Sequence, residues 1–130
     1  MISIDEYSST LSDVRRERMI LCFDYLRRKY PDLEESCDYT PKIKIPYFKR
    51  DNGTKYGIYV AFSSPKAHMS IHFSNYQGSI IVKGELKNIK TGVGCVNIPD
   101  KVDFPMGSIQ KAFDITFSWK LLIYISYHVL

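Results

Sequence analysis

The stretch that decides the fold runs from Tyr39 to Phe73, with the sequence YTPKIKIPYFKRDNGTKYGIYVAFSSPKAHMSIHF. Apolar and polar residues alternate on both sides of Asp51-Asn-Gly-Thr54, and an Asn-Gly turn between such runs is a strong hairpin signal. A second turn, Ser63-Ser-Pro-Lys66, leads into a third alternating run. The pattern predicts antiparallel strands at about 40–48, 56–63 and 67–73.

The third predicted strand has a core side and a polar side, because successive side chains of a strand point to opposite faces. The residues expected in the core are Ala67, Met69, Ile71 and Phe73. The polar side carries Lys66, His68, Ser70 and His72. The two histidines lie about 13 Å apart along a strand, so they cannot share one Zn²⁺. We interpret the polar side as a candidate ligand-binding face, with two exposed strand histidines as the alternative.

Helices are predicted before and after this region. Ser3-Ile-Asp-Glu6 has the form of a capping box and predicts a short helix from Ile4 to about Thr10. Helical spacing of apolar residues predicts a long helix over about 13–30 and another that begins at Ser108. Segment 74–90 is compatible with helix or strand, with helix preferred, and a short strand is expected at about 93–98.

The bulk properties are those of one globular domain. The 130 residues are 45% apolar and 25% charged, and we expect a single domain over 1–130. Its predicted core contains Phe23, Leu26, Ile45, Val60, Phe62, Met69, Ile71, Val96 and Phe113. Neither a signal peptide nor an apolar run of roughly 18 residues is seen, so we expect a cytoplasmic protein without a membrane span.

The cysteines Cys22, Cys37 and Cys95 have no Cys-x-x-Cys spacing and are interpreted as reduced thiols. Cys22 and Cys95 are expected to be buried, and Cys37, beside acidic residues, to be exposed. No Ser-His-Asp arrangement, HExxH motif or dinucleotide fingerprint is present, so an enzyme is the less favoured class.

Charge is divided unevenly along the chain. Residues 1–38 carry nine acidic and six basic side chains, a net −3, whereas residues 39–130 carry twelve basic and five acidic ones, a net +7. The basic part favours an anionic small ligand or a nucleic acid, although dispersed lysines are also typical of a solvated surface. Nucleic acid is the less favoured partner.

Four carboxylates after the long helix are the candidate metal ligands: Asp32, Glu34, Glu35 and Asp38. Carboxylate oxygens suit weak, exchangeable binding of hard or borderline ions such as iron or manganese, so no tightly bound cofactor is expected. The alternative is a solvated acidic loop. A separate candidate for anion binding is Thr91-Gly-Val-Gly94 with Lys90, although it lacks the Gly-Lys-Ser/Thr of a phosphate loop.

Three segments together resemble the YdhG-like family of small bacterial proteins of unknown function, which is grouped with frataxin-type iron-binding proteins. They are Ile45-Pro-Tyr-Phe48, Val60-Ala-Phe-Ser-Ser-Pro-Lys-Ala-His68 and Thr91-Gly-Val-Gly-Cys-Val96. The resemblance covers about residues 3–118 and implies an α+β two-layer sandwich, with N- and C-terminal helices packed on a mostly antiparallel sheet. It further implies a non-enzymatic iron donor, with the acidic cluster as the iron site and iron–sulfur or haem assembly proteins as partners.

The chain departs from the family pattern at two places. Val93 occupies a position where the family often has a basic residue, and this weakens the case for an anion site. The tail Leu121–Leu130 is rich in apolar residues, whereas family members tend to end with polar or basic ones. This tail should pack on the domain or form a homodimer contact, and a dimer is the expectation.

Overall fold

The structure is a computed structural model that describes residues 2–51, 53, 57–65, 68–74, 80, 84, 91–92 and 94–117. Its helices are α1 (Ile4–Ser9), α2 (Asp13–Lys29) and α4 (Met106–Phe117). Its strands are β1 (Glu34–Asp38), β2 (Lys44–Arg50), β3 (Ile58–Ser63), β4 (His68–Phe73), β5 (Thr91–Gly92) and β6 (Cys95–Pro99). They form one sheet in the order β1-β2-β3-β4-β6-β5, and every pairing is antiparallel.

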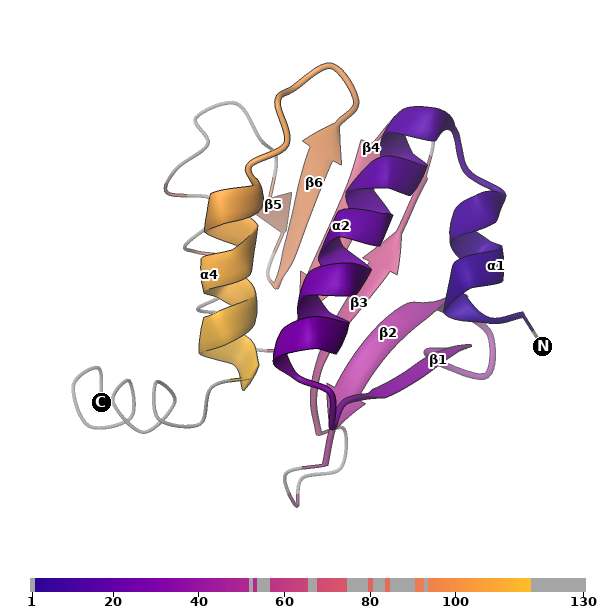
Figure 1. The fold of residues 1–130 in the computed structure, drawn as a ribbon, viewed down its shortest axis with the longest axis vertical. Coiled ribbons are helices and arrows are strands. Elements are labelled where there is room, and N and C mark those ends of the chain that lie inside the picture. The colour runs from indigo at the N-terminus through magenta and orange to yellow at the C-terminus, as the bar shows by residue number, and fades with distance from the viewer. Residues whose placement is uncertain are drawn as a thin grey trace.

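The two layers are the sheet and the helices α1, α2 and α4, which lie on one of its faces (Figure 1). The α+β sandwich expected from the sequence is therefore confirmed. Within the described residues, no helix is long and apolar enough to cross a membrane. The helix preference for 74–90 falls almost entirely outside the described residues, and the calls on the tail 121–130 fall outside them completely.

α1 begins and α2 ends where local signals place them, whereas α4 begins at Met106, two residues before the predicted start at Ser108. The Ser3 hydroxyl accepts a hydrogen bond from the Glu6 backbone N–H at 3.1 Å, and the Glu6 carboxylate accepts one from the Ser3 N–H at 3.4 Å. This is the predicted capping box of α1. α2 ends at Lys29, two residues before Pro31, because proline cannot continue a helix.

Strand β1 is a correction to the sequence interpretation, in which 32–38 was an acidic cluster or loop. Acidic residues are depleted in strands, so composition gave no strand signal. β1 nevertheless pairs with β2, and Glu34 lies opposite Lys49. Because β1 is an edge strand, its charged residues also oppose unwanted pairing with other chains.

The core lies between the sheet and the helices and contains eight of the nine predicted residues, each at most 1% exposed: Phe23, Leu26, Val60, Phe62, Met69, Ile71, Val96 and Phe113. The prediction that Ile45 belongs to the core is wrong, because this residue is half-buried. In β2 the inward positions belong to Pro46 and Phe48, and the strand period of two turns Ile45 to the other face.

The cysteine predictions had mixed outcomes. Cys22 is fully buried in the core, as predicted. Cys37 is only 2% exposed, which contradicts the predicted exposure, because its side chain points from β1 toward the core side. Cys95 lies in β6 but is half-buried rather than buried.

α2 and α4 are joined by polar contacts near their C-terminal ends. Asp114 of α4 accepts hydrogen bonds from the hydroxyls of Tyr25 and Tyr30, both at 2.7 Å, and pairs with Lys29 at 2.8 Å. Burial raises the pKa of Asp114, but these three partners outweigh it and hold the pKa below its usual range. Asp114 therefore stays ionised and fixes the C-terminal half of α4 against α2.

Candidate functional site

The sheet face opposite the helices gathers the polar residues predicted on β4. Because Met69, Ile71 and Phe73 point into the core, His68, Ser70 and His72 point to the other face. The predicted partners Lys66 and Lys90 lie outside the described residues. Three of the five predicted ligand residues therefore share this face.

Ser70 and His72 differ in what they can offer a ligand. Ser70 is buried and its hydroxyl bonds to the Asn97 side chain, so Ser70 orients Asn97 instead of reaching solvent. His72 is half-buried, with its Nε2 at 3.3 Å from the Ser63 hydroxyl. Burial lowers the pKa of His72 below its usual value, so its ring is neutral at pH 7 and carries one donor and one acceptor nitrogen.

Sequence analysis missed a group of three tyrosines on the same face, which we call the tyrosine patch: Tyr39, Tyr47 and Tyr59. The Tyr39 ring centroid lies 6.0 Å from that of Tyr47 and 5.5 Å from that of Tyr59. The Tyr39 hydroxyl donates to the Tyr59 hydroxyl at 3.0 Å. All three rings are half-buried, although no described helix covers this face.

Strand register joins the patch to His72. Tyr47 lies opposite Ala61, and Ala61 lies opposite His72. The small Ala61 side chain thus separates a phenol ring from an imidazole ring in one row across the sheet. Lys49 adds a cation beside the patch, with its Nζ 6.0 Å from the Tyr47 ring centroid.

The four candidate metal ligands do not converge, because each carboxylate has its own cationic partner. The closest N···O distances are 2.7 Å for Asp32–Arg50, 3.7 Å for Glu34–Lys49, 2.7 Å for Glu35–Arg27 and 2.9 Å for Asp38–Lys44. Glu34 and Glu35 are neighbours in β1 and point to opposite faces. In the part of the chain that the structure describes, no three His, Cys, Asp or Glu side chains are grouped to hold a metal ion.

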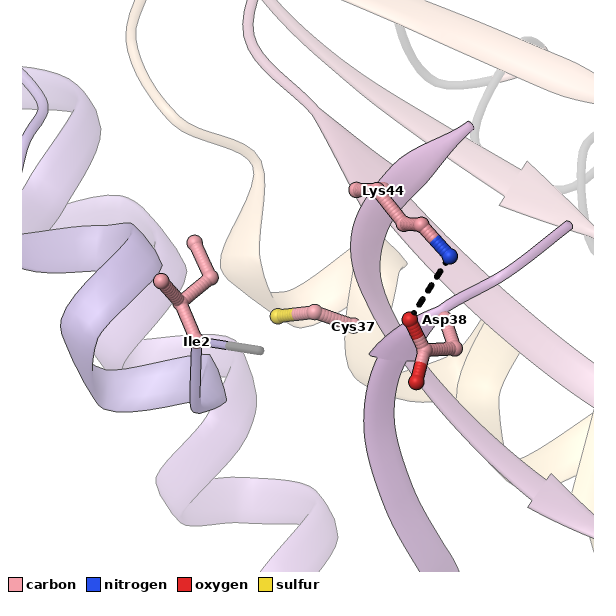
Figure 2. A pocket seen from close by; sticks show the side chains of 4 residues that line it. All are labelled: Ile2, Cys37, Asp38 and Lys44. Carbon is pink, nitrogen blue, oxygen red and sulfur yellow. Dashed lines mark hydrogen bonds and ion pairs between the residues drawn. The ribbon is translucent and has the colours of Figure 1, made fainter. Parts of the chain in front are cut away.

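One end of the acidic strand lines a pocket of about 510 Å³ formed by Ile2, Cys37, Asp38 and Lys44. Figure 2 shows the Cys37 sulfur pointing toward Ile2, with the Asp38–Lys44 ion pair on the other side. Burial raises the pKa of the Cys37 thiol, and the negative charges of Asp38 and Glu6 raise it further. The thiol is therefore protonated at neutral pH and is not an activated nucleophile.

The glycine-containing segment near Thr91 is part of the sheet. Thr91 pairs with Val96 and Gly92 with Cys95, so these two residues form the edge strand β5 beside β6. Gly94 has φ +77°, a conformation that favours glycine, and its carbonyl accepts the Phe73 N–H at 2.7 Å. Val93 and Lys90 lie outside the described residues.

Together these features define a small α+β domain with helices on one sheet face and tyrosine, histidine and hydroxyl side chains on the other. No family model matches the chain, and no curated protein matches it. A solved structure does: the crystal structure of a DUF1801-family protein, YdhG, from Bacillus subtilis, with a TM-score of 0.65 and 22% identity. The match covers 91% of this chain and 90% of that one, so the fold is YdhG-like.

Proposed function

We propose that the protein is a non-catalytic binding protein whose ligand lies on the sheet face opposite the helices, across the tyrosine patch and His72. The observation that carries this proposal is the gathering of Tyr39, Tyr47 and Tyr59 on that face. Tyrosine is common at binding surfaces because it combines a large rigid ring with a hydroxyl.

The hydrogen-bonding groups suggest the ligand class. The Tyr59 hydroxyl accepts from Tyr39 and keeps its own proton to donate. Neutral His72 of the neighbouring strand β4, and Ser63 at the end of β3, supply further donors and acceptors. Aromatic faces beside mixed donors and acceptors fit a planar heteroaromatic ring such as a nucleobase, and Lys49 can approach an attached phosphate. We therefore propose a small nucleotide-like ligand.

Tyr47→Ala should weaken nucleotide binding about tenfold, because stacking of a base on an aromatic ring is worth roughly 1–3 kcal/mol. The measurement is calorimetric titration of the full chain with AMP, GMP, CMP and UMP. Tyr47→Phe is the matched control and should bind nearly as well as the parent, since it keeps the ring.

Two results would contradict this proposal: no binding of any mononucleotide by the parent, or equal affinity in the parent and Tyr47→Ala. A twelve-residue oligouridine distinguishes a further case. If only the oligonucleotide binds, with affinity that falls steeply as salt rises, the face contacts single-stranded nucleic acid instead of a small ligand.

We propose iron binding as a second candidate function, in which the protein acts in the cytoplasm as a frataxin-like iron donor to iron–sulfur or haem assembly proteins. The resemblance to YdhG-like and frataxin-type proteins motivates it. Its support in the molecule is that Asp32 and Glu34 remain 58% and 74% exposed in their ion pairs. Such surface pairs are worth only about 0–1 kcal/mol, so a metal ion can displace the cation at small cost.

For iron, the combined variant Glu34→Gln, Glu35→Gln, Asp38→Asn should weaken Fe²⁺ binding with little change in stability, because charge is removed near the surface. The measurement is anaerobic titration with Fe²⁺, with Zn²⁺ and Mn²⁺ for comparison. The control variant Glu17→Gln, Asp24→Asn removes two exposed acids from α2 and should bind like the parent. A parent that binds no iron, or a triple variant with unchanged affinity, would rule this function out.

A further inference from the structure

α2 carries three aliphatic residues, on sides turned away from the sheet, that are at least 40% exposed: Val14 at 44%, Ile20 at 40% and Leu21 at 51%. A surface helix normally presents charged and polar residues to solvent and keeps its apolar stripe for the core. The apolar stripe of α2 is already complete without them, since Met19, Cys22, Phe23 and Leu26 are buried against the sheet. The exposed aliphatics therefore need another explanation.

Two of them lie on the side of α2 that faces α4. At about 100° per residue, positions 14 and 21 are only about 20° apart around the helix, and Tyr25 lies on the same side. Tyr25 reaches Asp114 of α4, which identifies this side. We call Val14 and Leu21 the α2 ridge. Ile20 is on the opposite flank near Arg27, which pairs with Asp5 of α1.

The chain has a second apolar feature, the segment that follows α4 in the sequence. Residues 118–130 are SWKLLIYISYHVL, in which Lys120 is the one residue of the Asp, Glu, Lys and Arg group. Phe117, the last described residue before this segment, lies beside the end of α2. The Phe117 ring lies 5.6 Å from that of Tyr30, and the Phe117 carbonyl accepts a hydrogen bond from Arg50 at 2.6 Å.

The segment is long enough to reach the ridge. α2 and α4 lie side by side and end at the same edge of the molecule (Figure 1). Leu21 precedes Tyr30 by about 13 Å along the helix axis and Val14 by about 24 Å. Residues 118–130 span about 20 Å as a helix and about 40 Å when extended. A tethered segment also has an effective concentration in the millimolar range, which favours its own chain over a second copy.

We propose that the α2 ridge is the docking surface for the C-terminal segment 118–130 of the same chain. In this arrangement the segment covers Val14 and Leu21. The ridge in turn covers apolar side chains of the segment that would otherwise face water. Docking would also place the segment over the outer side of the α2–α4 contact at Tyr25 and Asp114.

The test compares Leu21→Lys with Ile20→Lys in the full-length chain. Both positions are exposed, so neither change should unfold the domain. Hydrogen exchange of the 121–130 peptides and the fluorescence of Trp119, the single tryptophan, report on the segment. Leu21→Lys should abolish exchange protection in 121–130 and shift Trp119 emission to the red. Ile20→Lys should leave both signals as in the parent.

Other outcomes would overturn the proposal. One is a segment without protection in the parent, and another is protection that survives Leu21→Lys or is lost equally in both variants. Light scattering can give a third outcome that would overturn the proposal. If the parent is a dimer and protection in 121–130 disappears on dilution, the occupant is the segment of a second copy, and the same-chain assignment is wrong.

Discussion

Replacing Phe62 by Ala is expected to lower the free energy of unfolding by about 3–5 kcal/mol. Phe62 is fully buried at the centre of the aromatic core, with its ring centroid 5.3 Å from Phe23, 6.3 Å from Phe48 and 6.1 Å from Phe113. These rings come from α2, β2, β3 and α4, so the cavity would open between both layers. Urea denaturation followed by circular dichroism measures the loss.

Ile45→Ala is the matched control for Phe62→Ala. It also shortens an apolar side chain of the sheet, but Ile45 is half-buried on the face opposite the helices. The expected loss is below about 1 kcal/mol, because less apolar surface returns to water. Equal losses in the two variants would show that the core is not organised around Phe62.

Local patterns predicted most of the fold because the forces behind them act between near neighbours in the sequence. The capping box at Ser3 and the proline after α2 work within one helical turn. The alternation in 39–73 follows from the strand period and gave β2, β3 and β4. Its limit appears at Ile45, which lies in β2 but in the phase that points away from the core. Both phases of this strand contain apolar residues, Ile45 and Tyr47 in one and Pro46 and Phe48 in the other, and the second set is the buried one.

The candidate sites depended on contacts between distant residues, which single-sequence reasoning does not supply. Glu35 meets Arg27 of α2 and Asp32 meets Arg50 at the end of β2, so four acids that look like one cluster are divided among four cations. The tyrosine patch had a usable signal, since Tyr47 and Tyr59 occupy outward positions in two paired strands. Tyr39 lies outside those strands, and its place beside them follows only from the β1–β2 turn.

Arg18 is a charged residue of α2 that is nevertheless buried. By residue type it belongs to the polar face of α2, yet the whole residue is only 9% exposed. Its guanidinium donates to the backbone carbonyls of Pro99, Asp100 and Val102, and it lies 5.3 Å from the Phe104 ring centroid. One side chain thus ties α2 to the chain between β6 and α4.

Arg18→Met is therefore expected to lower the free energy of unfolding by about 2–4 kcal/mol. A methionine fills similar space but leaves three part-buried carbonyls without their charged donor. A hydrogen bond to a charged group contributes roughly 1.5–3 kcal/mol net of solvent, and the three bonds of one side chain do not add in full. Arg18→Lys should recover only part of the loss, because an ammonium group lacks the planar fork that serves three acceptors at once. Denaturant melts measure all three proteins.

Arg28→Met is the matched control, since Arg28 is an exposed arginine of the same helix. Its removal should change stability by no more than about 0.5 kcal/mol. Hydrogen exchange adds a second readout: Arg18→Met should speed exchange in 99–105 and at the start of α4 more than in α1, because the lost contacts join α2 to that segment alone. The free energy of unfolding lost in Arg18→Met could instead be no larger than that lost in Arg28→Met. In that case water replaces the guanidinium at the three carbonyls, and the position of α4 is fixed by the hydrogen bonds to Asp114 and by the core.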